Sequence, residues 1–428
     1  MKLKAVLMTG CLLIGGTAFS TVAQAQNTIK VGILHSLSGT MAISETTLKD
    51  TILMMIDAQN KKGGLLGKKL EPVVVDPASN WPLFAEKAAE LLEKDKVSVV
   101  FGCWTSVSRK SVLPVFEKDD GLLFYPVQYE GEESSRNVIY TGAAPNQQAI
   151  PAVDYLMKEV GVKRWVLEGT DYVYPRTTNK ILEAYLLAKG VKHEDISINY
   201  TPFGYSDWQT RVAQIKRFGS AGKKTAVVST INGDANVPFY KELGNQKISA
   251  ENIPVVAFSV GEEELSGLDA RPLVGHLAAW NYFESINTPV NRQFINQWHT
   301  FIKNPKRTTN DPMEAHYIGF NLWVKAVQKA GTTNVDQVIK ALPGLEVPNL
   351  TGGTAKVLPN HHITKPVYIG EVKADGQFNV VWKSAGEVPG DAWSDYLPGS
   401  KDIEADWVTL NCGNYNKITK KCSGQNYK

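Results

Sequence analysis

The chain has 428 residues, of which 43% are hydrophobic, and a formal charge of +3 at pH 7. This length exceeds what a single hydrophobic core usually fills, so two domains are expected. The near-balanced charge gives no basic footprint for nucleic acid, and no nucleic-acid partner is expected. Beyond the N-terminal stretch, no apolar run approaches the ~20 residues of a membrane span.

The first 25 residues have the pattern of an export signal. Lys2 and Lys4 precede an apolar stretch over residues 5–19, and Ala-Gln-Ala at 23–25 fits the rule of small residues around a cleavage site. We therefore expect residues 1–25 to be removed. The mature chain would begin at Gln26 and be exported.

The four cysteines have different predicted roles. Cys11 lies in the predicted signal, where lipidation would tether the protein, but the apolar stretch before it is short for a lipoprotein signal. Cys412 and Cys422 lie close together in a polar tail, which in an exported protein favours a small disulfide loop over two free thiols. Cys103 is then left over. Its position at a strand end favours a buried, inert thiol over a nucleophile.

Strands and helices alternate along most of the chain, which predicts parallel sheets with right-handed crossovers. Short apolar runs indicate buried strands, and apolar residues at helical spacing indicate helices. Ser44 and Asn80 are expected to cap helices, and Pro175 to lie in the first turn of another. An Asp-Gly turn at 375–376 predicts a hairpin. The predicted strands are residues 28–34, 70–75, 97–102, 122–125, 164–168, 196–200, 225–230, 254–259, 276–283, 368–372 and 378–382. The helices with predicted bounds are residues 45–60, 147–160, 207–218, 237–243, 289–302 and 312–330.

The alternation occurs in two series, separated by a stretch of small residues and proline at 142–146. The predicted fold class is α/β, with two lobes that each hold a mostly parallel sheet flanked by helices. Such a hinged clamshell closes around its ligand. The predicted first lobe comprises residues 26–143 and 284–355, the second comprises 144–283 and 356–385, and 386–428 form a tail with the disulfide loop.

Two neighbouring strand ends in the first lobe bring polar and aromatic side chains to one place. Ligands of open parallel sheets bind beyond the carboxyl ends of the strands. An aromatic, uncharged and hydroxyl-rich site suits a small neutral polar molecule. The alternatives are core packing of Trp104 and Tyr125, and helix capping by Ser106. The side chains at these strand ends are Trp104, Ser106, Tyr125, Gln128 and Tyr129.

The second lobe offers tyrosines and carboxylates at corresponding places. Tyr172 and Tyr174 point to the same side if their segment is extended, and could instead pack the surface between the lobes. The glutamates at 262–264 follow another strand end. They form either a solvated helix start or include one carboxylate that faces the cleft and accepts N–H bonds from a ligand.

The sequence carries no familiar catalytic signature. It has no G-x-S-x-G elbow, H-E-x-x-H pair or P-loop. His361 and His362 are adjacent and do not share a face, so no metal site is expected. We expect a binding protein without a cofactor rather than an enzyme. A secreted amide hydrolase is the alternative, and it would need a nucleophile beside a histidine.

The chain resembles the periplasmic solute-binding proteins of the branched-chain amino-acid type and, among them, the urea and short-chain amide group. Six segments carry the resemblance and keep the order of the family across most of the predicted mature chain. They are GCWTSVSRK at 102–110, YPVQYEG at 125–131, GAAPNQQ at 142–148, DYVYP at 171–175, SVGEEE at 259–264 and TNDPMEA at 309–315.

The resemblance implies a type I two-lobed binding protein that feeds an inner-membrane ABC permease. Amino-acid-binding relatives typically carry a threonine where this chain has Val127, which argues against an amino-acid ligand. We therefore expect urea. Formamide, acetamide and branched-chain amino acids are the alternative ligands, and a sensory protein with a signalling partner is the alternative class. The resemblance places ligand contacts on Trp104, Ser106, Tyr125 and Gln128 of the first lobe and on Asp171, Tyr172, Tyr174 and Glu263 of the second.

Overall fold

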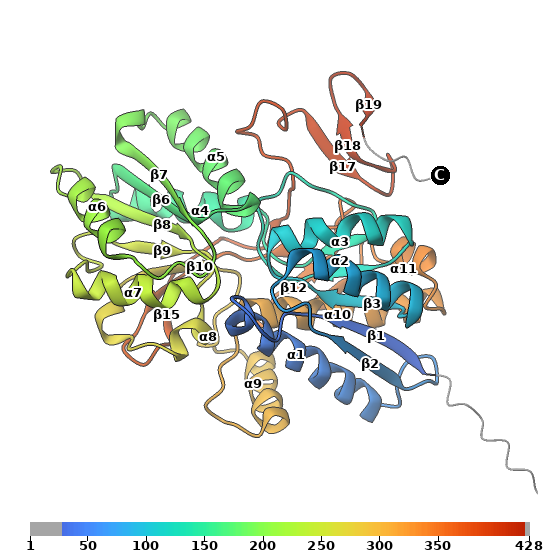
Figure 1. Cartoon of the computed structure of the whole chain (residues 1–428). Coiled ribbons are helices and arrows are strands. Elements are labelled where there is room, and N and C mark those ends of the chain that lie inside the picture. Colours follow the sequence, from blue (N-terminus) through green and yellow to red (C-terminus); the bar gives the residue numbers. More distant parts are fainter. Residues whose placement is uncertain (1–27, 424–428) are drawn as a thin grey trace, which may run out of the picture.

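The computed structural model describes residues 28–423, which form two α/β lobes side by side (Figure 1). The predicted export signal and the predicted start of the mature chain lie outside this range. The predicted two-lobed fold is confirmed. Within the described residues, no helix is both long and apolar enough to cross a membrane.

The first lobe holds a five-stranded sheet in the order β2-β1-β3-β4-β5, and all of its strands are parallel. Helix α1 packs on α10 and helix α2 packs on α3. The strands are β1 Ile29–Leu34, β2 Leu70–Val75, β3 Val99–Gly102, β4 Leu123–Tyr125 and β5 Val138–Tyr140. The helices are α1 Ala42–Lys61, α2 Trp81–Ala89, α3 Ser106–Lys118, α9 Pro289–Ile302, α10 Asp311–Ala330 and α11 Val335–Ala341.

The second lobe holds a seven-stranded sheet in the order β15-β14-β10-β9-β8-β6-β7. Five strands are parallel, and the hairpin β14–β15 adds two antiparallel strands at one edge, as the Asp-Gly turn predicted. The strands are β6 Arg164–Thr170, β7 Ile196–Thr201, β8 Thr225–Thr230, β9 Val255–Ala257, β10 Leu277–Trp280, β14 Tyr368–Val372 and β15 Phe378–Lys383. The helices are α4 Ala149–Tyr155, α5 Val173–Ala188, α6 Gln209–Gly219, α7 Asn236–Asn245 and α8 Glu262–Ser266.

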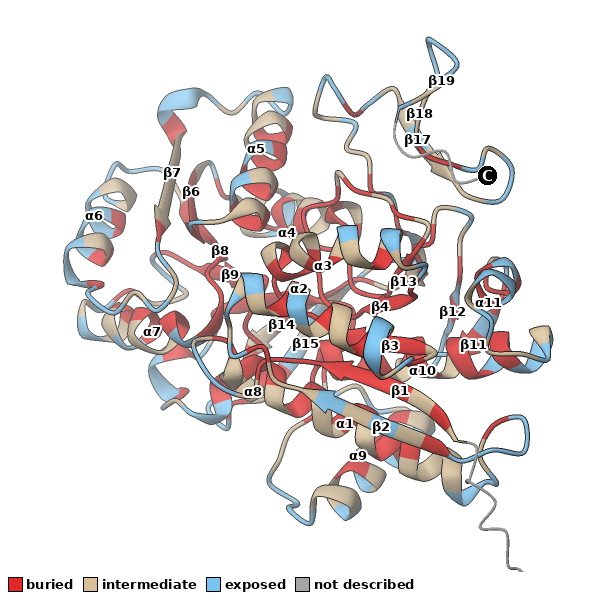
Figure 2. Cartoon of the chain, turned by 45° about the vertical axis from the view of Figure 1, so that its right-hand side comes forward, coloured by how far each residue is buried: buried red, intermediate tan, exposed pale blue. Residues whose placement is uncertain are grey.

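The central strands are almost continuously apolar because both of their faces are buried, whereas the edge strands β2, β7 and β15 are partly exposed. In β6, Trp165 and Leu167 belong to the core on one face of the sheet, and Val166 belongs to the core on the other. In the first lobe, Phe101 of β3 stacks on Phe124 of β4, with ring centroids 5.2 Å apart. Figure 2 shows the buried central strands of both sheets, with exposed residues on the outer surfaces of the helices.

Helix starts differ in detail from the expectation. The Asn80 cap of α2 is confirmed, since its Oδ1 accepts a hydrogen bond from the backbone N–H of Leu83 at 3.1 Å. The Ser44 cap is wrong, because α1 begins at Ala42 and Ser44 lies inside its first turn. The cap of α3 is Thr105, whose side chain accepts from the N–H of Ser108, so Ser106 is free for other contacts.

Three chain crossings between the lobes are tied to one another by buried polar side chains. The Asn281 amide donates to the carbonyl oxygens of Gln147 (3.0 Å) and Pro366 (2.7 Å), one on each of the other two crossings. Lys365 donates to the carbonyl oxygen of Thr141 at 2.7 Å. These contacts join the crossings into one unit, around which the lobes can move relative to each other.

The tail folds back onto the body of the protein. Strand β16 (Val388–Pro389) pairs with β13 (Thr364–Lys365), next to the crossings. A three-stranded sheet then lies at the edge of the molecule (Figure 1). The predicted disulfide between Cys412 and Cys422 is present, and its Cα atoms are 6.0 Å apart. The remaining short strands are β11 Glu346–Pro348, β12 Thr354–Lys356, β17 Ile403–Asp406, β18 Cys412–Asn416 and β19 Lys421–Cys422.

Candidate functional site

The predicted first-lobe residues meet the second lobe beyond the carboxyl ends of β3 and β4. Trp104 and Tyr125 are buried, and the Tyr125 hydroxyl donates to the carbonyl oxygen of Trp104 at 2.5 Å. The indole N–H of Trp104 donates across the gap to the Oδ1 of Asn232, at 3.2 Å. Asn232 follows β8, so strand ends of both sheets converge here, as expected for ligand sites of open sheets.

Gln128 forms a second direct contact between the lobes. Its amide donates to the hydroxyl of Ser259, which follows β9, at 2.7 Å. The Gln128 carbonyl oxygen is buried and has no hydrogen-bond partner among residues 28–423. Burial raises the pKa of the Tyr174 phenol, whereas its hydrogen bonds with the Gln128 and Ser259 side chains lower it. Buried polar atoms normally have partners, so the Gln128 oxygen, with the Tyr174 hydroxyl beside it, indicates capacity for a polar ligand.

Tyr172 and Tyr174 come together by a different route from the one predicted. Their segment is not extended, because α5 begins at Val173. The two rings nevertheless lie near each other, with centroids 6.1 Å apart. Tyr172 also packs on Phe203, whose ring contacts Trp81 of the first lobe at 5.2 Å. Burial, and next the Tyr125 phenol, raise the pKa of Tyr172 well above its usual value.

A buried ionic network lies beneath the first-lobe residues. Ser106 donates a short hydrogen bond to Glu130, and Arg109 donates to Glu130 at 3.2 Å and to Glu133 at 2.7 Å. The Arg109 guanidinium also lies over the Tyr125 ring, 4.7 Å from its centroid. Arg109 and Glu130 were not predicted as site residues. The only sequence clue was their spacing, since Arg109 lies one helical turn after Ser106 and Glu130 two residues after Gln128.

Charges in this network compensate one another. Burial alone would lower the pKa of Arg109, but the carboxylates of Glu133 and Glu130 hold it well above its usual value. Burial likewise opposes ionisation of Glu133, but Arg109 and Lys110 lower its pKa to about 2. Lys110 donates to Glu133 at 2.9 Å. Two cations therefore face two carboxylates, and this part of the site presents no net charge.

Asp171 precedes Tyr172 in the sequence, but its carboxylate has a different partner. Its carboxylate accepts a hydrogen bond from the Arg176 guanidinium at 2.6 Å, and 46% of its side chain is exposed. Arg176 lowers the pKa of Asp171. The structure therefore does not bring Asp171 into contact with Gln128, Tyr174 or Trp104.

The three glutamates at the start of α8 have three different environments. They are not a solvated helix start, since Glu262 and Glu264 are buried. Glu263, the predicted contact, binds Arg307 at 3.1 Å. Glu264 accepts a hydrogen bond from Ser44 of α1 at 2.7 Å. Burial raises the pKa of Glu264 to about 7, against the hydrogen bonds that it accepts.

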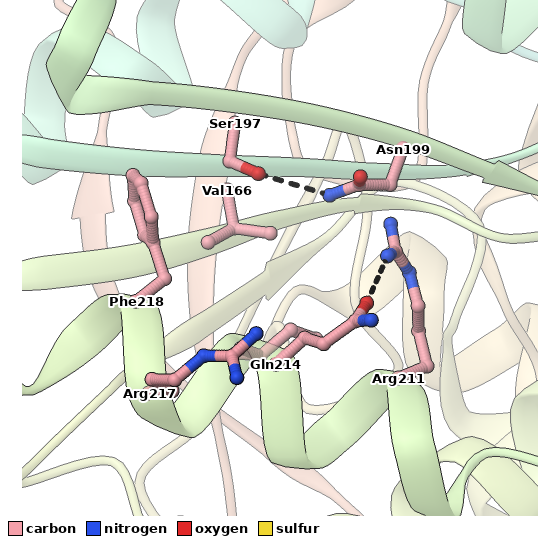
Figure 3. A pocket seen from close by; sticks show the side chains of 8 residues that line it. Val166, Ser197, Asn199, Arg211, Gln214, Arg217 and Phe218 are labelled. Carbon is pink, nitrogen blue, oxygen red and sulfur yellow. Dashed lines mark hydrogen bonds between the residues drawn. The ribbon is translucent and has the colours of Figure 1, made fainter.

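A separate cavity of about 280 Å³ lies on the second lobe between helix α6 and strands β6 and β7 (Figure 3). Arg211 donates to Gln214 at 2.5 Å on its helical side, and Asn199 donates to Ser197 at 3.1 Å on its strand side. None of the predicted site residues lines this cavity. It therefore does not belong to the interlobe site.

The histidine pair at 361–362 packs in the body of the first lobe. His362 stacks on Tyr140, with ring centroids 4.6 Å apart. Burial lowers the pKa of His361 to about 3 and that of His362 to about 4. Between residues 28 and 423, no three His, Cys, Asp or Glu side chains gather in a way that could hold a metal ion.

Two α/β lobes with three crossings and a buried polar site between them define a hinged receptor for small molecules. Residues 29–399 match the family described as periplasmic binding protein domain. The chain belongs to the periplasmic binding protein family.

The individual relatives have low sequence identity to this chain. "Leu/Ile/Val-binding protein homolog 6" of Brucella melitensis is 25% identical over 371 residues, which cover 83% of this chain and 91% of that protein. "Limonene hydroxylase" of Geobacillus stearothermophilus is 29% identical over 115 residues, so this chain spans only 21% of that protein's length. A solute-binding protein from R. palustris, solved with 4-hydroxybenzoate, is 20% identical with a TM-score of 0.73, and the match covers 85% of this chain and 98% of that chain. This likeness shows the fold.

Proposed function

We propose that this protein is a periplasmic solute-binding receptor that captures urea between its lobes and delivers it to an ABC-type permease in the inner membrane. The single observation that carries the proposal is the buried, unpartnered carbonyl oxygen of Gln128, next to the Tyr174 hydroxyl at the meeting point of the lobes. The carbonyl oxygen of Gln128 accepts an N–H of urea, and the Tyr174 hydroxyl donates to the urea carbonyl.

The size of the site supports a small ligand. The lobes are bonded directly to each other at Trp104–Asn232 (3.2 Å) and at Gln128–Ser259 (2.7 Å). A ligand as long as leucine or 4-hydroxybenzoate would have to separate both pairs. Urea has four heavy atoms and four N–H donors, so it requires less separation of these pairs than a longer ligand does. This argument applies equally to formamide and acetamide.

The charge of the site supports a neutral ligand. A zwitterion or a benzoate needs an uncommitted cation for its carboxylate, whereas the buried Arg109 is paired with Glu130 and Glu133. Breaking such a buried pair costs about 3 to 5 kcal/mol. The ligands named for the Brucella and R. palustris proteins carry charged groups. A branched-chain amino acid is therefore the second candidate ligand. Val127, at the position where amino-acid-binding relatives typically have threonine, weighs against it.

All eight ligand contacts expected from the sequence remain part of the proposal. Six of them lie at or next to the contacts that Trp104 and Gln128 make with the second lobe. Asp171 and Glu263 would have to exchange their present partners Arg176 and Arg307 for the ligand. The six residues at or next to these interlobe contacts are Trp104, Ser106, Tyr125, Gln128, Tyr172 and Tyr174.

The surroundings of Ser106 favour a receptor over the hydrolase alternative. Its hydroxyl binds Glu130 and Arg109 instead of a histidine that could take its proton. A nucleophilic serine needs such a base within hydrogen-bond reach. Delivery to a permease follows from the family, whose members present a closed, loaded form of both lobes to the membrane partner.

Calorimetric titration of the ligand-stripped mature protein tests the proposal. We expect tight binding of urea and at least tenfold weaker binding of formamide, acetamide and leucine. Formamide and acetamide lack the second amino group of urea, so they leave one acceptor of the site unpaired, which costs about 10-fold or more in affinity. Binding of leucine but not urea would transfer the proposal to the amino-acid alternative. Heat from formamide or acetamide alone would identify a short-chain amide receptor.

A further inference from the structure

The C-terminal segment holds the loop that follows β4. The backbone N–H of Glu132 donates to the carbonyl oxygen of Ala392 at 2.6 Å, and the Glu132 carboxylate accepts from the backbone N–H of Ser394 at 3.0 Å. Further along, the indole N–H of Trp407 donates to the hydroxyl of Ser134 at 2.8 Å. The loop is thus held through both its backbone and its side chains.

Two glycines allow the segment and the loop to approach this closely. Gly131 has φ +69°, and a Cβ there would lie 2.5 Å from the carbonyl oxygen of Ala392. A Cβ on Gly413 would lie 2.6 Å from the carbonyl oxygen of Ser134 and 2.5 Å from the Trp407 ring. Gly413 directly follows Cys412, so the disulfide closes the hairpin that carries this contact.

The same loop carries the carboxylates of the ionic network. Glu130 accepts from Ser106 and Arg109, and Glu133 accepts from Arg109 and Lys110. Arg109 lies over the Tyr125 ring. A displacement of the loop would therefore move the groups that set the position and charge of the first-lobe half of the site.

The segment also reaches the second lobe. Tyr396 packs edge-on against Tyr185 of α5, with ring centroids 5.0 Å apart. The N-terminal end of α5 carries Tyr172 and Tyr174. One segment therefore contacts the loop that supplies Glu130 and the helix that presents the two tyrosines.

We propose that residues 388–423, here called the C-terminal brace, position the ligand site. Glu132 of the loop and Trp407 of the brace are the positioning residues. The Cys412–Cys422 disulfide keeps the brace in place. The inference rests on the proposed function for its ligand. Reduction converts the disulfide to two thiols, opens the β18–β19 hairpin and gives the loop more freedom. Ligand affinity then falls although no ligand contact is altered.

The first test compares the mature protein in its oxidised, phosphine-reduced and re-oxidised forms, by calorimetry with urea. We expect about tenfold weaker binding after reduction and recovery on re-oxidation, since small displacements of a built site lower affinity by this order. Cys412→Ser/Cys422→Ser should bind like the reduced protein and be insensitive to phosphine. Trp407→Phe, which keeps an aromatic side chain but loses the indole N–H and one of the two fused rings, should weaken binding severalfold. Thr419→Ala, in the exposed turn of the same hairpin, should change nothing.

The second test needs no ligand. Amide hydrogen exchange of the peptide spanning residues 129–134 should become faster on reduction and in Trp407→Phe, and stay unchanged in Thr419→Ala. Unchanged exchange in both the reduced protein and Trp407→Phe would overturn the inference. Faster exchange with unchanged urea affinity would also overturn it, since the brace would then be structural only. If the oxidised protein fails to bind urea but the exchange result is as expected, the proposed ligand is refuted. The brace would still be shown to hold this loop.

Discussion

The amide nitrogen of Gln128 lies 2.7 Å from the hydroxyl of Ser259 and joins the two lobes where their strand ends meet. The other atom of that amide, the carbonyl oxygen, is buried and unpartnered within residues 28–423. Gln128 therefore has two separable roles. Its nitrogen holds the lobes together, and its oxygen is available to a ligand donor.

Replacement of Gln128 should affect ligand binding more than folding. Gln128→Leu keeps the side-chain volume but removes both the interlobe bond and the acceptor, so we expect the Kd for urea to rise about tenfold to a hundredfold (about 1–3 kcal/mol). Calorimetry measures the change. Gln293→Leu, at an exposed position of α9, is the matched control and should bind urea like the parent. Parental affinity in Gln128→Leu would remove Gln128 from the site.

Tyr174→Phe should lower both the stability of the ligand-free protein and its affinity for urea. The change removes the hydrogen bonds of the hydroxyl with Gln128 and Ser259, so thermal unfolding of the ligand-free protein should occur at a lower temperature. The same change should weaken urea binding by about 1 kcal/mol or more, since the urea carbonyl loses a donor. Tyr155→Phe, on the partly exposed α4, should alter neither quantity. Equal affinity in Tyr174→Phe would contradict its role as a ligand donor.

Much of the fold could be predicted from the sequence because its information is local. The strand ends at 102 and 125 lie where the apolar runs stop, and the Asn80 cap and the Asp-Gly hairpin follow from residues that are close in sequence. Ser44 shows the limit of this approach. A serine before a helical pattern is typical of a cap, but its hydroxyl binds Glu264 of the other lobe, 220 residues away, and no local pattern contains that partner.

The candidate site was predictable in its aromatic and amide residues and not in its ionic ones. Trp104, Tyr125 and Gln128 follow strand ends, so the topology alone brings them together. Arg109 looked like an ordinary charge on a helix, because its burial depends on the loop after β4 folding over it. The partners of Asp171 and Glu263 likewise depend on where Arg176 and Arg307 project, which only the packed structure defines.

Arg109 should be more important for stability than any exposed arginine. Arg109→Met leaves the buried carboxylates of Glu130 and Glu133 with the partly exposed Lys110 as their remaining cation, and we expect a loss of about 3 kcal/mol in the free energy of unfolding. Unfolding should be followed by guanidinium chloride or heat, because urea is the proposed ligand. Arg271→Met, whose ion pair with Asp269 is exposed, should cause only a small change in stability. A loss of that small size in Arg109→Met would show that the network adds nothing to stability.

Glu264 should make the protein less stable as the pH rises from about 4.5 to about 7. Burial raises its pKa from 4.5 to about 7, so in this window the unfolded chain has released the proton that the folded chain still holds. The stabilisation is complete below the unfolded pKa and is lost as the pH passes through the folded one. Its upper limit is about 3 kcal/mol.

Glu264→Gln isolates this contribution, because the amide keeps an acceptor for Ser44 and does not titrate. Glu168 and Glu314 also have pKa values raised to about 7 by burial, so they give the parent and the variant the same background slope. The measurement is the difference in unfolding free energy between parent and Glu264→Gln across pH 4 to 8. We expect this difference to shift in favour of the variant as the pH rises through the window. A difference that stays constant with pH would mean that Glu264 ionises in the folded protein as it does in the unfolded chain.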